Sequence, residues 1–205
     1  MSGVSPGGTV PPASGGNRPP GPPVPPGRPV PPGPAVAGDL SPRTPLAHPI
    51  GPPLRRQTAR VLPIDPEGRV LLLHGWDPHH PEEPFWFTIG GAAEEGESMR
   101  DAAARELYEE TGISVDPSRL GEPIAHNTIE FSWGGHRVAQ DQTFYAVFIE
   151  SADVSLDGLD QWERATTDKY GWLSADDLGA DEPPAHPDIP DLIRAAVARV
   201  GISPR

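Results

Sequence analysis

The sequence contains no cysteine among its 205 residues, and aromatic residues make up only 6% of it. The absence of cysteine excludes disulfides and any thiolate zinc site. No stretch approaches the ~20 consecutive apolar residues of a membrane-spanning helix. The N-terminus also lacks the basic start and apolar stretch of a secretory signal. We therefore expect a cytoplasmic protein with no membrane partner.

Basic residues are scarce: 16 Lys and Arg stand against 29 Asp and Glu, so the net charge is −13. Proteins that bind nucleic acid non-specifically present a basic face, and anionic membranes attract basic segments. The charge therefore argues against both kinds of partner. A nucleotide substrate is still compatible with it, because a bound metal ion inverts the local field.

Proline and glycine are abundant, but unevenly placed. Residues 1–53 hold 18 of the 30 Pro and 10 of the 23 Gly, and no aromatic residue. Such a segment cannot bury enough apolar surface to offset its ordering entropy. We predict a disordered tail over residues 1–53 and one folded domain over residues 54–205. The tail has PxxP spacings that an SH3-like partner accepts, but a solubilising or spacing role is favoured, since any Pro-rich tail produces such matches.

The segment 91–113 (GAAEEGESMRDAAARELYEETGI) is the most informative part of the chain. Ser98 is placed to cap a helix at its N-terminus. The following residues, 99–111, are rich in the helix formers Ala, Arg, Leu and Glu, and Gly112 suits the left-handed residue that ends a helix. The segment therefore predicts a helix over residues 99–111.

Three glutamates gather on this helix. Glu106 lies three residues before Glu109 and four before Glu110, so the three carboxylates occupy neighbouring surface positions. Clustered negative charges repel unless a cation lies among them, and oxygen-only ligands suit Mg²⁺ or Mn²⁺. Arg105 precedes Glu109 by four residues, which allows it to hold that carboxylate in place. The alternative interpretation is a solvated acidic face.

The full spacing, G-x5-E-x7-R-E-L-x-E-E-x-G-I, resembles the box of the Nudix family, whose members hydrolyse a nucleoside diphosphate linked to another moiety. The resemblance implies an α/β/α sandwich with a mixed sheet, and Mg²⁺ or Mn²⁺ as cofactor. It also implies roles for particular residues. The implied metal ligands are Glu106, Glu109 and Glu110; the implied catalytic residues are Glu109, Glu110 and Arg105; and the residues that support the motif are Gly90, Gly91, Glu97 and Gly112.

Residues outside the box complete the predicted site. Many members of this family supply a further carboxylate as metal ligand or general base. Glu163 is the first candidate for that catalytic role, with Glu150 and Asp168 as alternatives; a solvated loop acid is the competing interpretation. Trp86 and Trp133 are candidates for substrate binding, because an aromatic face stacks on any nucleobase. For each Trp, packing in the core or at its rim is the more common explanation.

The remaining patterns predict strands and two more helices. We expect strands over residues 58–64, 69–74, 85–88 and 169–173, a hairpin formed by 124–133 and 137–150, and a loop over 75–84. A brief helix is expected over 174–178 and a last helix from Pro190 to about Val200. Strands with helices on a mixed sheet indicate an α/β domain.

The sequence therefore predicts metal-dependent hydrolysis of a diphosphate linkage in a nucleoside diphosphate derivative. The alternative is a nucleotide-sensing binding module of the same fold with weak catalysis. The partner is a nucleoside diphosphate-type small molecule in either case. The pattern does not name the nucleotide, and it leaves a homodimer open.

Overall fold

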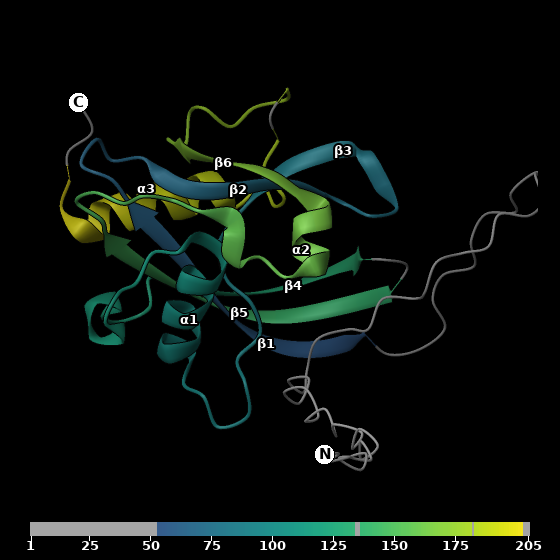
Figure 1. Ribbon diagram of the computed structural model, residues 1–205, viewed down its shortest axis with the longest axis horizontal. Helices are drawn as coiled ribbons and strands as arrows, with labels where there is room; N and C mark the ends of the chain where they lie inside the picture. The colour runs from purple at the N-terminus through teal and green to yellow at the C-terminus, as the bar shows by residue number, and fades with distance from the viewer. Residues whose placement is uncertain (1–52, 134–135, 182, 203–205) are drawn as a thin grey trace, which may run out of the picture.

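A six-stranded mixed sheet forms the centre of the protein. The computed structural model describes residues 53–133, 136–181 and 183–202. The strand order is β3-β2-β1-β5-β4, and β6 pairs with β2. β1 and β5 run parallel, whereas the other strand pairs are antiparallel (Figure 1). The strands are β1 (Leu54–Ile64), β2 (Val70–Asp77), β3 (His80–Phe87), β4 (Ala125–Trp133), β5 (His136–Phe148) and β6 (Thr167–Leu173).

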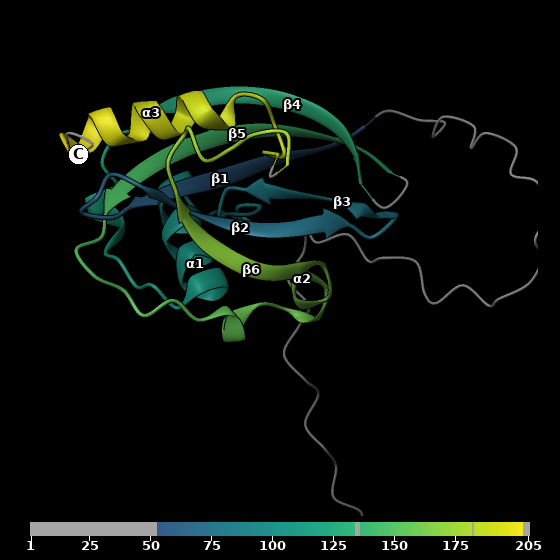
Figure 2. The same ribbon diagram turned by 90° about the horizontal axis from the view of Figure 1, so that it is seen from above.

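Helices cover both faces of this sheet. α3 (Ile189–Val200) lies on one face, while α1 (Met99–Thr111) and the short α2 (Gln161–Thr166) lie on the other side (Figure 2). Two 3₁₀ turns, η1 (Pro117–Leu120) and η2 (Leu156–Gly158), pack near α1. The arrangement is the predicted α/β/α sandwich.

Alternate residues of the central strands fill two separate cores. Val61 of β1 and Leu71 of β2 are fully buried beneath α1, whereas Leu62 and Leu72 are fully buried beneath α3. Successive side chains of a strand point to opposite faces, so a strand covered on both sides needs a continuous apolar run. This explains the LLL segment of β2, which lies within the strand predicted over residues 69–74.

The helix predicted over residues 99–111 is confirmed together with both of its caps. The Ser98 hydroxyl accepts a hydrogen bond from the Asp101 backbone N–H at 3.1 Å. Gly112 adopts a left-handed conformation with φ of 72°, and its N–H donates to the Tyr108 carbonyl. Both ends of α1 are therefore fixed by local sequence, which sets the rotation of its glutamates relative to the sheet.

The structure corrects two of the predicted elements. Residues 75–84 are not a loop, because β2 continues to Asp77 and pairs with β3 from His80. The prolines of β3 suggested a loop, but an edge strand tolerates residues without an N–H donor. Residues 174–178 are not a helix either. The Asp177 carboxylate instead accepts hydrogen bonds from both the N–H and the hydroxyl of Ser174, which closes a turn.

Other predicted elements have mixed outcomes. The hairpin of β4 and β5, the strand β6 and the helix α3 are confirmed. The sequence analysis did not find α2. The tail predicted over residues 1–53 lies outside the described residues, except for Pro53. No helix in the described part of the chain is long and apolar enough to cross a membrane.

Candidate active site

The three glutamates of α1 differ in exposure. Glu106 and Glu110 are only 3% and 6% exposed, whereas Glu109 is partly exposed. The carboxylate of Glu110 accepts a hydrogen bond from the Gly90 backbone N–H at 3.1 Å. The alternative interpretation, a solvated acidic face, therefore does not describe Glu106 and Glu110. These two side chains lie between the helix and the loop that follows β3.

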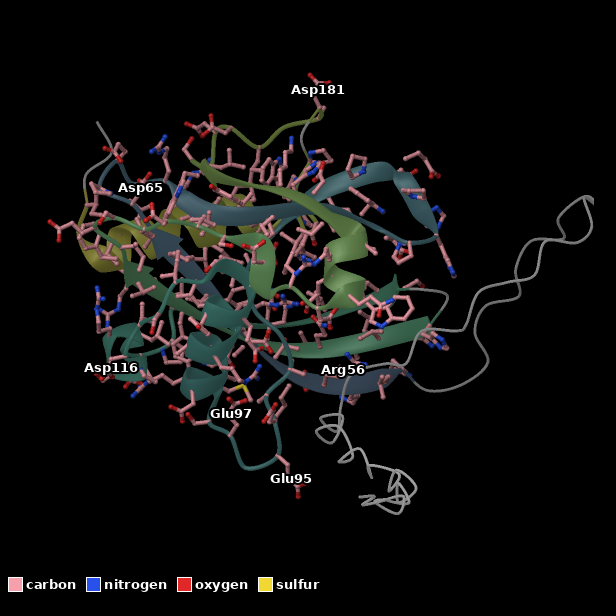
Figure 3. All side chains as sticks on the ribbon, viewed as in Figure 1. Arg56, Asp65, Glu95, Glu97, Asp116 and Asp181 are labelled. Atoms are coloured by element: carbon pink, nitrogen blue, oxygen red, sulfur yellow. The ribbon has the colours of Figure 1, made fainter. Side chains whose placement is uncertain are left out.

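Arg105 organises the N-terminal side of this cluster. Its guanidinium makes two hydrogen bonds of 2.9 Å to the two carboxylate oxygens of Glu97. A third nitrogen, Nη1, donates to Glu106 at 2.8 Å and to Glu109 at 2.9 Å. Figure 3 shows Glu97 beside the N-terminal end of α1. The hydrogen bond to Arg105 is the main cause of the lowered pKa of Glu97, so this carboxylate stays ionised and anchors the arginine.

Two glycines bring the loop backbone against the carboxylates. Gly90 has φ of 130°, and an added Cβ would lie 2.1 Å from the Ala59 carbonyl oxygen of β1. At Gly91, an added Cβ would lie 2.6 Å from Glu106 Oε1. The Gly91 carbonyl in turn accepts the Ala59 N–H at 2.9 Å. The absence of both side chains therefore lets β1, the loop and Glu106 meet closely.

Glu163 is brought to this cluster by α2. Its backbone N–H donates to the Asp160 side chain, and its carboxylate accepts the Asp160 N–H at 2.9 Å, which forms a capping box. The charge of Glu163 contributes to the raised pKa of Glu110, so the two carboxylates lie within electrostatic reach. The catalytic role predicted for Glu163 is compatible with this position and stays a prediction.

Burial raises the pKa of Glu110 well above its ordinary value, and the negative charges of Glu106 and Glu163 raise it further. The Gly90 N–H and the positive charge of Arg60 oppose the shift without cancelling it. An ionised Glu110 is therefore unfavourable in this cluster unless a further cation lies nearby.

The donor set fits a hard divalent cation, because all of the candidate ligands are carboxylate oxygens. The side chains are not yet arranged around one ion: among the described residues, no three His, Asp or Glu side chains form a group that could hold a metal. Arg105 explains this, since it holds the carboxylates of Glu106 and Glu109. Ligation by these two residues requires their carboxylates to turn away from the guanidinium.

Arg60 is a site residue that the sequence analysis missed. From β1, its Nη1 donates hydrogen bonds to the Gly90 carbonyl at 2.6 Å and to the Thr88 carbonyl at 3.2 Å. Its Nη2 donates a hydrogen bond to Gln140 Oε1 at 3.1 Å. Burial lowers its pKa, while the charges of Glu110 and Glu106 raise it. The sequence does contain a signal that could have identified Arg60, because it is a charged residue within a strand that otherwise contributes to the core.

The other predicted residues lie further from the cluster. Trp86 is 4% exposed and packs in the core beneath α3, with its ring 4.9 Å from that of His74; this burial does not support stacking on a base. Asp168 contacts His74 at 2.6 Å. Glu150 is exposed just beyond the end of β5. The backbone N–H of the preceding residue, Ile149, donates a hydrogen bond to the Ile64 carbonyl at the far end of β1. The side chain of Trp133 lies outside the described part.

Known proteins resemble this chain along most of its described length. A family model described as NUDIX domain matches residues 54–196. The RNA pyrophosphohydrolase of Erythrobacter litoralis (strain HTCC2594) is 28% identical over 131 residues, which cover 60% of this chain and 78% of that protein. The dihydroneopterin triphosphate diphosphatase of Escherichia coli (strain K12) is 37% identical over 68 residues, which cover 33% of this chain and 43% of that protein.

Solved structures share the fold. The MutT protein from Methanosarcina mazei Go1 matches with a TM-score of 0.51 at 22% identity, over 73% of this chain and 97% of that one. The NUDIX domain of Shewanella oneidensis NrtR, complexed with ADP ribose, matches with a TM-score of 0.51 at 18% identity, over 74% of this chain and 90% of that one. At these identities the likeness concerns the fold alone.

Proposed function

Since this chain belongs to the NUDIX family of hydrolases, we propose that it cleaves a diphosphate linkage in a nucleoside diphosphate derivative with the help of Mg²⁺ or Mn²⁺. The observation that carries the proposal is the burial of the neighbouring carboxylates Glu106 and Glu110 beneath the Gly90 loop. This burial raises the pKa of Glu110, and the negative charges of Glu106 and Glu163 raise it further. A cation removes that repulsion, and the anionic substrate then no longer meets an uncompensated negative cluster.

The proposed ligands are Glu106, Glu109 and Glu110. A divalent ion held by these residues would supply Lewis-acid chemistry to a phosphoryl oxygen and to the attacking water. Glu97 keeps Arg105 in place through two hydrogen bonds, and Arg105 in turn limits the positions open to Glu109. Ligation by Glu106 and Glu109 would exchange their hydrogen bonds to Arg105 for the cation, while Glu97 would keep the guanidinium beside them.

Glu163 is proposed as the general base. Its carboxylate takes the proton of the attacking water, the water oxygen forms a bond to phosphorus, and the P–O bond of the anhydride breaks, so that the leaving phosphate carries away the electron pair. The capping box fixes the Glu163 carboxylate at the start of α2. A fixed carboxylate within electrostatic reach of Glu110 suits this role.

A panel of substrates tests the proposal. The panel contains nucleoside triphosphates, ADP-ribose, a dinucleoside polyphosphate and a 5′-triphosphorylated oligonucleotide, each with Mg²⁺, with Mn²⁺ and with excess EDTA. We expect hydrolysis of at least one compound, loss of turnover in EDTA, and recovery when Mg²⁺ or Mn²⁺ is restored. The rate is expected to rise with pH as the general base deprotonates. Turnover that persists in excess chelator would contradict the proposed mechanism.

A second candidate is a nucleotide-binding module with weak catalysis. The observation that favours it is the engagement of Glu106 and Glu109 with Arg105, which leaves no assembled group of three ligands in the described part of the chain. The two candidates differ in turnover. Tight nucleotide binding with no hydrolysis across the whole panel would favour the binding module.

A further inference from the structure

Buried polar atoms without hydrogen-bond partners gather in one part of the sheet. Within the described residues, five buried side-chain nitrogen or oxygen atoms lack a partner. Four of the five belong to strands β1 and β4: Arg56 Nε, Thr58 Oγ1, Arg60 Nε and Asn127 Oδ1. Buried polar groups in native proteins are nearly always hydrogen-bonded, so a local group of exceptions needs a cause.

Strand register places these side chains on one face. Thr58 of β1 lies opposite Gln142 of β5, and Gln142 lies opposite Asn127 of β4. Residues opposite one another in neighbouring strands point to the same side of a sheet, so the three form a row across three strands. Arg56 and Arg60 flank Thr58 on the same face, because alternate residues share a side. We name this set, with Gln140 and Gln142, the β1 polar row.

The β1 polar row begins where the apolar surface beneath α3 ends. The same face of β1 continues into the apolar residues Leu62 and Ile64, which pack in the core beneath α3. Thr58 is nevertheless only 1% exposed, and Gln140 and Gln142 are 8% and 7% exposed. The hydrogen bond between the two glutamine side chains, at 2.9 Å, satisfies part of this set, but the Thr58 hydroxyl has no partner within the described part of the chain.

The row carries positive charge in an acidic protein. Arg56 makes no ion pair with any carboxylate of the described residues, although the chain carries a net charge of −13. Burial lowers its pKa, so part of its hydration has been lost without replacement. Guanidinium groups bind phosphate through paired N–H donors. The Arg56 guanidinium, which forms no ion pair within the described residues, and the neighbouring Thr58 hydroxyl therefore suit an anionic ligand with further hydrogen-bonding groups.

The geometry points to a phosphate subsite: we propose that the β1 polar row binds the nucleotide part of the substrate, and that Arg56 binds a phosphate group on the 3′ side of that nucleotide. This inference rests on the proposed function. Arg60 holds the Gly90 carbonyl beside Glu110, whereas Arg56 lies four strand residues further, or about 13 Å. A substrate bound along the row would thus place its anhydride near Arg60 and, one nucleoside away, a second phosphate at Arg56.

Two sources supply this chemistry: the 3′-phosphate of a mononucleotide and the first phosphodiester of a nucleic-acid chain. Binding is measured by calorimetry in the presence of Mg²⁺ with AMP, adenosine 3′,5′-bisphosphate and the 5′-phosphorylated dinucleotide pApA, none of which contains an anhydride to hydrolyse. We expect both of the latter to bind at least about tenfold more tightly than AMP. Preference for pApA alone would identify the chain phosphodiester as the ligand, and equal affinity for all three would overturn the proposal.

Arg56→Gln and Arg55→Gln form a matched pair. Arg55 is the adjacent residue on the opposite face, where it pairs with Asp141 in an exposed contact of 3.3 Å. Arg56→Gln is expected to reduce the preference for the 3′-phosphate by about tenfold, which corresponds to about 1.4 kcal/mol, and Arg55→Gln is expected to preserve it. An equal loss in both variants would show a general effect of charge and overturn the assignment of Arg56.

Thr58→Val provides a second test with little change of shape. If the hydroxyl serves a ligand, its removal weakens binding of adenosine 3′,5′-bisphosphate while it raises the melting temperature of the free protein, because an unpaired buried group is lost. Unchanged affinity would remove Thr58 from the subsite. These binding measurements need no turnover, so absence of hydrolysis in the substrate panel would defeat the proposed function and leave the test of the subsite intact.

Discussion

At the scale of single residues, Glu109 and Glu110 make the sharpest prediction for catalysis. Changing either to Gln keeps its shape but removes its charge, and we expect kcat to fall about 10²-fold or more, as when a metal ligand that supports transition-state charge is lost. Glu95→Gln is the control, because this residue is exposed and points away from the cluster at the tip of the loop before α1 (Figure 3). Full activity of both variants at limiting Mg²⁺ would contradict the metal assignment.

The stability of the Glu110→Gln variant depends on pH. The raised pKa of Glu110 means that the folded protein binds more protons than the unfolded chain between the ordinary and the raised pKa. The wild-type protein therefore loses stability as pH rises through that window. Without metal at pH 7, we expect Glu110→Gln to melt above the wild type by about 2–4 °C for each kcal/mol recovered.

Thermal melts at pH 4 and pH 7, each with EDTA and with excess Mg²⁺, check this expectation. The difference between the variant and the wild type should shrink at pH 4, where Glu110 is protonated in both the folded and the unfolded wild-type chain. It should also shrink with Mg²⁺, because the cation favours the ionised carboxyl. A constant difference under all four conditions would show that neither the burial of the Glu110 charge nor its repulsion by Glu106 and Glu163 has a part in it.

At the scale of elements, the loop between β3 and α1 positions the carboxylates. A Cβ at Gly91 would displace the end of the Glu106 side chain, which lies 2.6 Å away and can move. Gly91→Ala is therefore expected to lower Mn²⁺ affinity and kcat/KM by about tenfold or more while it changes the melting temperature little. Gly179→Ala is the control, since an added Cβ there meets nothing within 4 Å. Equal Mn²⁺ affinity in the two variants would exclude the loop from ligand placement.

Local signals explain which elements could be predicted. Ser98 and Gly112 mark the ends of α1 in the sequence, and both caps form as expected. The same kind of signal was present for α2, because Asp160 and Glu163 have the spacing of a capping box, and its omission was an error of interpretation. β3 has no such signal: its pairing with β2 outweighs its proline content.

Long-range contacts explain what the sequence could not place in the site. The spacing along α1 identifies Glu106, Glu109 and Glu110, but it does not reveal that the loop after β3 buries Glu106 and Glu110. Arg60 reaches the site only because β1 lies beside the Gly90 loop. Contacts between residues 30 positions apart leave no local periodicity, so the folded arrangement was needed to find them.

At the scale of the whole molecule, the relation of the Pro-rich segment to the folded part makes the last prediction. Among the described residues, both cores are built from side chains that follow Pro53, beginning with Ala59 on one side and Leu62 on the other. Residues 1–53 hold 18 Pro and 10 Gly and no aromatic residue, so they have no nucleus for a core of their own. We expect a chain that begins at Leu54 to fold, to melt within a few degrees of the full-length protein, and to keep its kcat/KM. The measurements are thermal melts and steady-state kinetics of both chains on the same substrate, with amide exchange of the full-length protein, in which residues 1–53 are expected to be unprotected. Removing a segment that is only a spacer would alter neither the proposed ligands of α1 nor the β1 polar row. A change of about tenfold in KM, or about 1.4 kcal/mol of binding, would therefore show that the segment contributes to the site.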